Sequence, residues 1–530
     1  MLATLAGGLG LFLLGMTMMT DGLRLAAGPA LERILAGATR TRWHGLGSGV
    51  LVTALVQSSS AVTVATIGFI NAGLLTLGGA LWVLFGANVG TTMTGWIVAL
   101  LGLKFKVETL AMPLVGLGVA LSLSGSQQRR GAIGTAMAGF GLLFMGIALL
   151  QQAMGGLADQ VSLPDGTGIG AVLLQMMVGV GLTVLMQSSS ASLTVALTAA
   201  QGGLLSPEGA AGVVIGANVG TTVTALLAAI GATPSAKRAA LAHVAFNIVT
   251  AVVALALLPW LLHGIRVLGG WLALPPDAAT QLALFHTVFN VLGVVLMWPL
   301  ASHLTRWLQQ HVAVGADADH KPHHIDHTLL GVPSLAVEAL GLEVQRLGGL
   351  ACDALAAAAR GEDGTALARR AALFHALDAE VGRFAQSLNR ASMSAPTSQT
   401  LARWLRVRGH DRHVLDTAVA AAAVAWPGGE GAAEVERHLA QATDVLLNSL
   451  RPTPVAGSGD QSVTRLAQES LQAFVQAHDH FKAHGLAQAA AGHWTVPQLD
   501  AWLHKATLLK EAALAAMRAA HWRETPLPES

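Results

Sequence analysis

Two short polar motifs each occur twice in a long apolar stretch of the chain. The sequence QSSSA at 57–61 recurs at 187–191, and GANVGTT at 86–92 recurs at 216–222, both with the same offset along the chain. Serine hydroxyls compete with the backbone for hydrogen bonds, and closely spaced glycines weaken a helix and let backbone approach a ligand. Both motifs therefore predict breaks in helices. Inside a membrane such breaks must face protein or a wet cavity, which is the setting of small-ion sites in duplicated transporters.

The residues around these motifs carry almost no charge, which limits the kind of ligand. No Asp, Glu, Lys or Arg occurs in 43–103, and only Glu208 occurs in 166–236. An anion bound here would depend on N–H groups at helix starts and on Ser and Thr hydroxyls, and a bound cation would offset its charge. Oxygen atoms of Asn, Gln, Ser and Thr suit a hard monovalent cation. The chemistry thus predicts cation-coupled transport of a small anion.

Ordinary helix packing is the alternative for any single motif, because small and hydroxylated residues also line helix contacts in membranes. The repetition of two whole motifs at one spacing favours a binding site. The candidate ligands are Gln57, Ser58, Ser59, Ser60, Gln187, Ser188, Ser189, Ser190, Asn88, Thr91, Thr92, Asn218, Thr221 and Thr222.

A second pair of motifs carries histidine and asparagine. His243 and Asn247 stand at positions i and i+4, as do His286 and Asn290, so each pair lies on one face of a helix. These pairs are candidates for lining a transport pathway or for gating it. A satisfied helix-packing contact is an equally compatible interpretation.

The composition indicates that these motifs lie in a membrane protein. Only 12% of the 530 residues are charged, 53% are hydrophobic, and the mean hydropathy is +0.56. Such a chain has too little charge to coat itself and enough apolar length to cross a bilayer several times. A net charge of +1 argues against a nucleic-acid partner. The single cysteine, Cys352, excludes an internal disulfide.

Charge divides the chain into two parts. Of 31 basic and 30 acidic residues, twelve and seven fall before residue 311, and the rest follow it. We therefore expect a transmembrane domain at 1–310, a linker at 311–334 and a soluble helical domain at 335–530. Within the linker, His320, His323, His324 and His327 lie near Asp317, Asp319 and Asp326. A metal site is one interpretation of these residues, and a solvated linker is the favoured one.

The repeats are expected at about 1–128 and 129–262, followed by an extra span at 281–305. If the segments around each QSSSA (45–72 and 171–200) enter and leave on the same side, nine basic residues fall on one side and three on the other. That bias is typical of a cytoplasmic face. It predicts inverted repeats, seven crossings, two re-entrant hairpins, an outside N-terminus with a retained first span, and a cytoplasmic tail.

These motifs resemble the type II sodium–phosphate cotransporter family, in its bacterial form with a PhoU-like C-terminal domain. The resemblance rests on both QSSS motifs, both GANVGTT segments and the His…Phe-Asn pairs. It implies a symporter of inorganic phosphate and sodium in the bacterial inner membrane, with the phosphate and sodium sites at the two QSSS motifs. No other cofactor and no catalytic residue is expected.

The Ala- and Leu-rich tail, 335–525, has helical spacing with breaks near 361–364, 394–396 and 427–429. It resembles a PhoU-type bundle, although only Asp378 and Glu380 stand out as metal ligands. The resemblance implies regulation of transport or contact with phosphate-regulation proteins; a plain solvated bundle is the alternative. A second copy of the chain, in a homodimer, is a further candidate partner. The fold class predicted is thus an all-α membrane protein with inverted repeats, re-entrant hairpins and broken helices, plus a soluble helical bundle.

Two other functions stay open at this stage. One is a phosphate-responsive membrane sensor with little net flux. The other is an intramembrane serine hydrolase, which is disfavoured because neither serine triplet lies in a Gly-x-Ser-x-Gly context.

Overall fold

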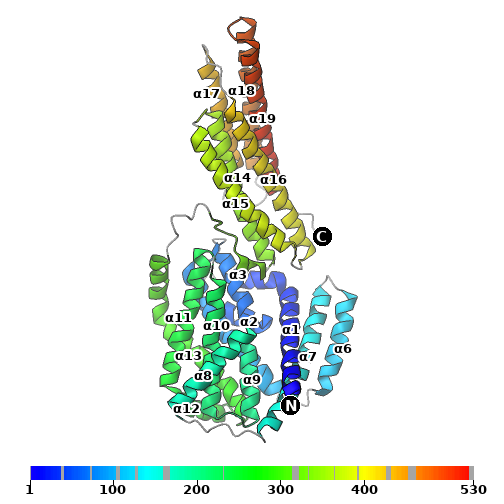
Figure 1. Cartoon of the computed structure of the whole chain (residues 1–530), viewed down its shortest axis with the longest axis vertical. Helices are drawn as coiled ribbons and strands as arrows, with labels where there is room; N and C mark the ends of the chain where they lie inside the picture. The colour runs from blue at the N-terminus through cyan, green and yellow to red at the C-terminus, as the bar shows by residue number, and fades with distance from the viewer. Residues whose placement is uncertain are drawn as a thin grey trace. The chain divides into compact units, whose positions relative to one another are not determined.

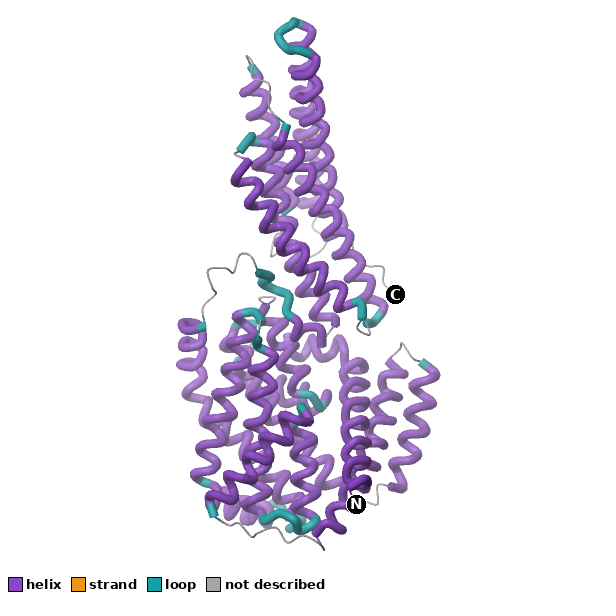
Figure 2. The backbone as a smooth tube through the Cα atoms, viewed as in Figure 1, coloured by secondary structure: helices purple, strands orange, loops and turns teal. Residues whose placement is uncertain are grey.

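The structure is a computed structural model of the whole chain, and every regular element that it describes is a helix (Figures 1 and 2). It describes residues 2–36, 41–71, 75–102, 108–125, 129–158, 168–230, 232–312, 321–331, 333–362, 364–390, 393–424, 431–451 and 461–524. The predicted all-α class is confirmed. Arg40, Lys104 and Lys106, which are among the twelve basic residues counted for the charge bias, lie outside these ranges. So do Asp317, Asp319 and His320 of the expected linker.

The chain forms two compact units, Met1–Val314 and Gly315–Ser530. The first, here called the membrane unit, contains α1 (Leu2–Ala36), α2 (Arg42–Val56), α3 (Ser59–Asn71), α4 (Leu77–Gly90), α5 (Thr92–Trp96), the π-helix η2 (Ile97–Gly102), α6 (Glu108–Ser124), α7 (Arg129–Ala158), α8 (Ile169–Met186), α9 (Ser189–Gln201), α10 (Pro207–Ala228), α11 (Pro234–Ala256), α12 (Leu258–Trp271) and α13 (Ala278–His311).

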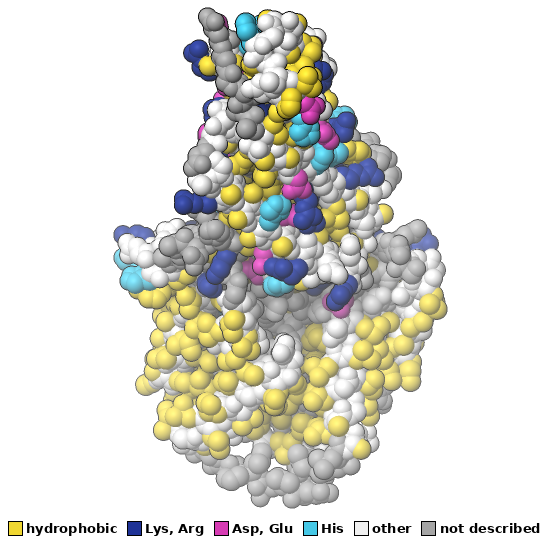
Figure 3. Space-filling view, turned by 45° about the horizontal axis from the view of Figure 1, so that its top comes forward, with side chains coloured by type: hydrophobic (Ala, Val, Ile, Leu, Met, Phe, Trp, Pro, Cys, Tyr) yellow, Lys and Arg dark blue, Asp and Glu magenta, His cyan; other side chains and the backbone are white. Residues whose placement is uncertain are grey.

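Seven helical segments of the described chain are long and apolar enough to cross a membrane. The chain is therefore a multi-pass membrane protein, and the visible flank of the membrane unit is largely hydrophobic (Figure 3). The number equals that of the predicted crossings, but the members differ. The 18-residue α8, expected as one arm of a re-entrant hairpin, is long enough to cross, whereas α6 has only 17 residues. The predicted topology remains a prediction.

Helices α1 and α7, which begin the two predicted repeats, pack antiparallel through glycines. A Cβ on Gly15 would lie 2.3 Å from Leu143 N, and one on Gly146 would lie 2.4 Å from Phe12 N. Gly15 and Gly146 are counterparts in the repeats, as are Phe12 and Leu143, so the two contacts interchange when the helices are exchanged. The interface therefore has a pseudo-two-fold axis, which is the packing that inverted repeats would produce.

The following helices also pack in equivalent ways in the two halves. A Cβ on Gly86 of α4 would lie 2.1 Å from Leu46 O of α2, and one on Gly216 of α10 would lie 1.9 Å from Met176 O of α8. The second pair occupies the positions in its repeat that the first pair occupies in the other. Glycine is thus needed in each GANVGTT motif because the neighbouring backbone occupies the space of a side chain.

The second unit is a set of long helices. These are the 3₁₀-helix η4 (His327–Gly331), α14 (Pro333–Ala359), α15 (Gly364–Leu388), α16 (Ala395–Ala423), α17 (Ala432–Leu450), α18 (Gln461–Ala490) and α19 (Val496–Glu524). Helix α14 packs on α15, α16 and α17, and α19 packs on α16 and α18. The three predicted breaks, near 361–364, 394–396 and 427–429, separate α14, α15, α16 and α17, whereas the breaks on either side of α18 were not predicted.

Part of the expected linker is ordered on this unit. Glu343 is fully buried, and its carboxylate accepts the backbone N–H groups of His323 and His324, both at 2.9 Å, and the guanidinium of Arg346 at 2.8 Å. Residues 321–331 are thereby fixed to α14. A freely solvated linker is therefore not what the structure shows for this stretch.

Candidate functional site

Each QSSS motif forms a sharp turn between two helices. Gln57 and Gln187 end α2 and α8 in the left-handed region, with φ of 57° and 51°. The next serine then caps the following helix: the hydroxyl oxygens of Ser58 and Ser188 accept the N–H groups of Ala61 and Ala191, both at 3.2 Å. Both motifs therefore place a helix C-terminus beside a helix N-terminus, as the sequence predicted for a helix break.

One side chain links the two motifs. The hydroxyl of Thr94, in α5, donates to Gln57 Oε1 at 2.8 Å and lies 3.4 Å from Ser190 Oγ. Thr94 is 3% exposed, so this contact is inside the protein. Equivalent segments of the two repeats, far apart in sequence, thus meet around one hydroxyl.

The two turns differ in their surroundings. Gln57 is 9% exposed, and its amide nitrogen donates to Ala54 O at 2.6 Å. Gln187 is exposed. Among the serines, Ser60 is exposed, whereas Ser58, Ser59, Ser188, Ser189 and Ser190 are half-buried.

The GANVGTT threonines direct their protons into their own helices. Thr91 and Thr221 donate to the carbonyls of Asn88 and Asn218, both at 2.6 Å. Thr92 and Thr222 likewise bond to the carbonyl three positions earlier, at 2.7 and 2.6 Å. Each hydroxyl oxygen therefore keeps its lone pairs for another partner, which favours a cation over an anion.

Each GANVGTT asparagine faces one of the predicted histidines. Asn88 Oδ1 lies 3.2 Å from His243 Nε2, and Asn218 Oδ1 lies 3.3 Å from His286 Nε2. Asn218 also donates to Asn290 Oδ1 at 3.0 Å. The His…Asn pairs are thus brought to the GANVGTT motifs, which the sequence alone did not predict.

The backbone of the two GANVGTT segments also differs. The first ends α4 at Gly90, continues into the short α5, and then winds into the π-helix η2. The second lies inside the continuous helix α10, so the helix break predicted at 216–222 is wrong. Single π-helical turns frequently mark functional positions in helices.

Three threonines of the site were not among the residues predicted from the sequence. Besides Thr94, these are Thr53 and Thr183, fully buried residues whose hydroxyls have no hydrogen-bond partner in the described part of the chain. Thr53 packs on Gly90 and Thr183 on Gly220. The signal was available, because Thr53 and Thr183 occupy equivalent positions in the two repeats.

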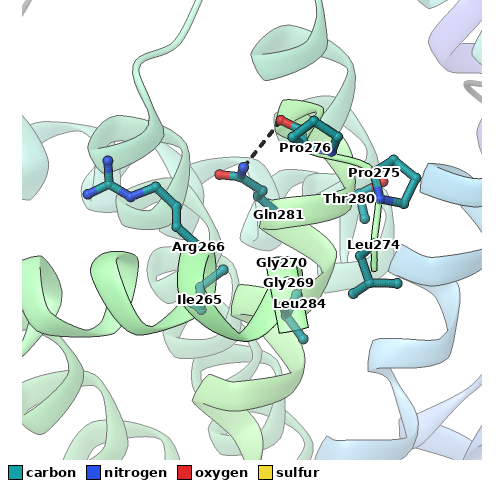
Figure 4. Close-up of a pocket in the computed structure, with 10 residues that line it drawn as sticks. All are labelled: Ile265, Arg266, Gly269, Gly270, Leu274, Pro275, Pro276, Thr280, Gln281 and Leu284. Atoms are coloured by element: carbon teal, nitrogen blue, oxygen red, sulfur yellow. Dashed lines mark hydrogen bonds between the residues drawn. The ribbon is translucent and has the colours of Figure 1, made fainter. Parts of the chain in front are cut away.

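A cavity of about 100 Å³ lies elsewhere, between α12 and α13 (Figure 4). Its polar lining includes the exposed Arg266 and Gln281, whose amide donates to Pro276 O at 3.2 Å. None of the candidate ligands lines it. Among the described residues, its lining has one cationic side chain, Arg266, and no residue of the repeated motifs. The cavity therefore does not replace the paired motifs as the candidate site.

The metal ligands considered in the tail have other partners. Asp378 is 1% exposed and pairs with Arg408 and Arg412, and Glu380 pairs with Arg383. No group of three His, Cys, Asp or Glu suited to a metal occurs among the residues that the structure describes, those of segment 321–331 included.

Comparison with known proteins identifies relatives of the membrane unit. The family model described as Na⁺/Pi-cotransporter matches residues 11–152 and 168–269. The uncharacterized protein YqeW of Bacillus subtilis is 30% identical over 297 residues, which cover 55% of this chain and 92% of that protein. No solved structure matches.

Two further relatives have names that describe phosphate transport. The putative inorganic phosphate export protein YjbB of Salmonella typhimurium is 28% identical over 338 residues, 63% of this chain and 60% of that protein. The human sodium-dependent phosphate transport protein 2B is 34% identical over 109 residues, 20% of this chain and 16% of that protein. The chain thus spans about 60% of the length of the YjbB relatives that it matches.

Proposed function

The chain belongs to the Na⁺/Pi-cotransporter family, and from this membership we propose that it is a sodium-coupled transporter of inorganic phosphate whose binding site is built from the two QSSS motifs. The family consists of transporters, so the serine-hydrolase alternative is dropped. The observation that carries the site assignment is the Thr94 hydroxyl, which bonds to Gln57 and contacts Ser190.

The anion side of the proposal rests on the two helix starts. Ser58 and Ser188 use an oxygen lone pair to cap α3 and α9, and in the hydrogen bonds of the described residues their hydroxyl protons remain available. The free backbone N–H groups in the first turn of α3 and of α9 point out of the helix start, where the positive end of the helix dipole lies. Such groups can hold phosphate without an arginine.

The cation side rests on oxygen lone pairs. The hydroxyls of the four GANVGTT threonines donate their protons to backbone carbonyls, so their oxygens can accept a cation. In addition, α2 and α8 end at the QSSS motifs, where the free carbonyls of the last turn concentrate negative potential. The hydroxyls of Thr53 in α2 and Thr183 in α8, which have no hydrogen-bond partner among the described residues, add further acceptors. Sodium bound to such oxygens would offset the charge of phosphate in a site without charged side chains.

We place the chain in a bacterial inner membrane with a cytoplasmic, PhoU-like tail that regulates transport, as the charge bias and the resemblance imply. YjbB is named a phosphate exporter, so the net direction in the cell is a separate question from the coupling. A phosphate sensor with little flux is the second candidate.

The test uses the full chain in lipid vesicles loaded without phosphate. An inward sodium jump should drive radioactive phosphate uptake, and a potassium jump should not. Reversing the sodium gradient after uptake should drive release of the accumulated phosphate. Sodium-independent uptake would refute the coupling, and phosphate binding without flux would favour the sensor.

A matched pair of variants tests the site. Ser188→Ala removes a cap whose loss costs about 1 kcal/mol of stability, and Ser206→Ala removes an equivalent cap on α10, also at 3.2 Å, outside the motifs. We expect uptake to fall at least tenfold in the first and less than twofold in the second. Equal losses would assign Ser188 a structural role only.

A further inference from the structure

Two groups of polar side chains, all buried except the half-buried His243, hold the GANVGTT asparagines and are here called clamps. The first clamp is Asn88, His243 and Asn247, and the second is Asn218, His286 and Asn290. In both, the His Nε2 faces the GANVGTT asparagine, at 3.2 Å and 3.3 Å, and the third residue donates to the backbone carbonyl of its own histidine. The clamps thus share residue types, spacing and contacts.

They differ in one hydrogen bond. In the second clamp, Asn218 Nδ2 donates to Asn290 Oδ1 at 3.0 Å. In the first clamp, Asn88 Nδ2 donates instead to the carbonyl of Leu84, in its own helix, at 3.2 Å. As a result Asn247, which is fully buried, has an Oδ1 atom without a partner among the described residues.

A buried acceptor without a partner is costly, so its presence calls for an explanation. Asn247 Oδ1 is the atom that Asn88 Nδ2 would reach if the first clamp adopted the arrangement of the second. The matching change in the second clamp would turn Asn218 Nδ2 to the carbonyl of Val214, the counterpart of Leu84.

Two other differences between the halves accompany this one. Gln57 is buried and bonded to Thr94, whereas Gln187 is exposed. The first GANVGTT segment is broken at Thr91, whereas the second is a continuous helix. Each difference lies at positions that are equivalent in the repeats.

We propose that the two clamps exchange arrangements, and that Asn247 and Asn290 are positioning residues that act through Asn88 and Asn218. That this exchange is the transport step rests on the proposed function; the exchange itself rests on the asymmetry of the clamps. In the alternative state the first clamp closes, the second opens, Gln57 becomes exposed and Gln187 becomes buried.

The hydrogen-bond inventory makes such an exchange feasible. Asn88 Nδ2 and Asn218 Nδ2 each have one acceptor in both states. The unpartnered oxygen merely moves from Asn247 to Asn290. Because the number of bonds is conserved, the two states can be close in free energy, as a transporter that alternates between them requires.

The test is hydrogen exchange of the full chain in lipid nanodiscs, followed by mass spectrometry of peptides around 53–62 and 183–192. Asn290→Ala removes an acceptor used only in the observed state, and Asn247→Ala removes one used only in the alternative state. Asn290→Ala should speed exchange at 53–62 and slow it at 183–192 by about fivefold, the factor expected for one net hydrogen bond. Asn247→Ala should shift both in the opposite direction.

Thr250→Val is the control, because Thr250 is buried on α11 and its hydroxyl donates within its own helix, to Phe246 O. It should change neither peptide. If an alanine variant fails to fold, Asn290→Ser and Asn247→Ser replace the pair. Shifts in the same direction, or no shift, overturn the proposal. Opposite shifts in a protein that shows no phosphate flux would support the exchange and refute the proposed function.

Discussion

Protonation of Asp411 should control the stability of the tail. Asp411 is 1% exposed on α16, and its carboxylate lies against Gly348 of α14, where a Cβ would be 2.9 Å from Oδ2. Its ion-pair partner is Arg523 of α19, at 3.7 Å, and Oδ2 has no hydrogen-bond partner within the described chain. Burial raises the pKa of Asp411 to about 7 from 3.8, and the Arg523 charge only partly opposes it.

The sign follows from linkage. Because the folded state holds the proton more tightly than the unfolded state, stability falls as pH rises from about 4 to about 7, and then levels off. The whole window corresponds to about 4 kcal/mol, and the part between about pH 5.5 and 7 to roughly 1–2 kcal/mol, because the carboxyl is already half ionised at about pH 7. That part is a roughly 15-fold change in an opening equilibrium.

The assay is hydrogen exchange at 405–418 in the full chain, comparing wild type with Asp411→Asn at each pH so that intrinsic exchange rates cancel. The two should differ least near pH 4, and the advantage of the variant in protection should grow roughly 15-fold between about pH 5.5 and 7. A constant ratio at all pH values, or a wild type that gains protection relative to the variant as pH rises, would refute the reasoning.

Three further predictions concern packing and turns. Gly216→Ala should lower the free energy of unfolding by about 3 kcal/mol or more, because the new Cβ would overlap the backbone of α8. Gly181→Ala, whose Cβ would meet open space, should raise it by about 0.5–1 kcal/mol. Thermal melting of the two variants in detergent compares them. Ala273→Gly should stabilise the α12–α13 loop by about 0.5–1 kcal/mol in the same assay, because Ala273 has φ of 51°; a loss would show that its methyl packs usefully. Glu343→Gln should weaken the hold on 321–331 by about 2 kcal/mol and speed proteolysis there, and unchanged cleavage would contradict it.

The sequence predicted the helical class and the repeated motifs because both depend on local composition and spacing. It also predicted the breaks that separate α14, α15, α16 and α17, but not those on either side of α18. It did not predict how the motifs meet, because that depends on helix packing. Thr94 illustrates the limit: nothing local distinguishes it from Thr224, its counterpart in the second repeat, yet only Thr94 bonds to a QSSS glutamine among the described residues.

The same limit applies to asymmetry between the halves. Identical sequences at 86–92 and 216–222 adopt a broken and a continuous helix. No pattern within either segment can produce that difference, so it must come from neighbouring helices. The prediction for segment 321–331 was wrong for another reason. Its polar composition indicated a solvated linker, but the buried carboxylate of Glu343 in α14 binds its backbone N–H groups.

The interface between α1 and α7 is self-complementary around Gly8 and Gly15 of α1, which receive the opposite backbone and have counterparts in Gly139 and Gly146 of α7. An isologous contact of this kind does not require its two sides to be covalently joined. A half-length ancestor able to insert in either orientation could have formed the same interface between two separate polypeptides. Co-expression of 1–128 and 129–530 as separate chains, followed by a test for their association, would show whether the interface forms without the covalent link between the repeats.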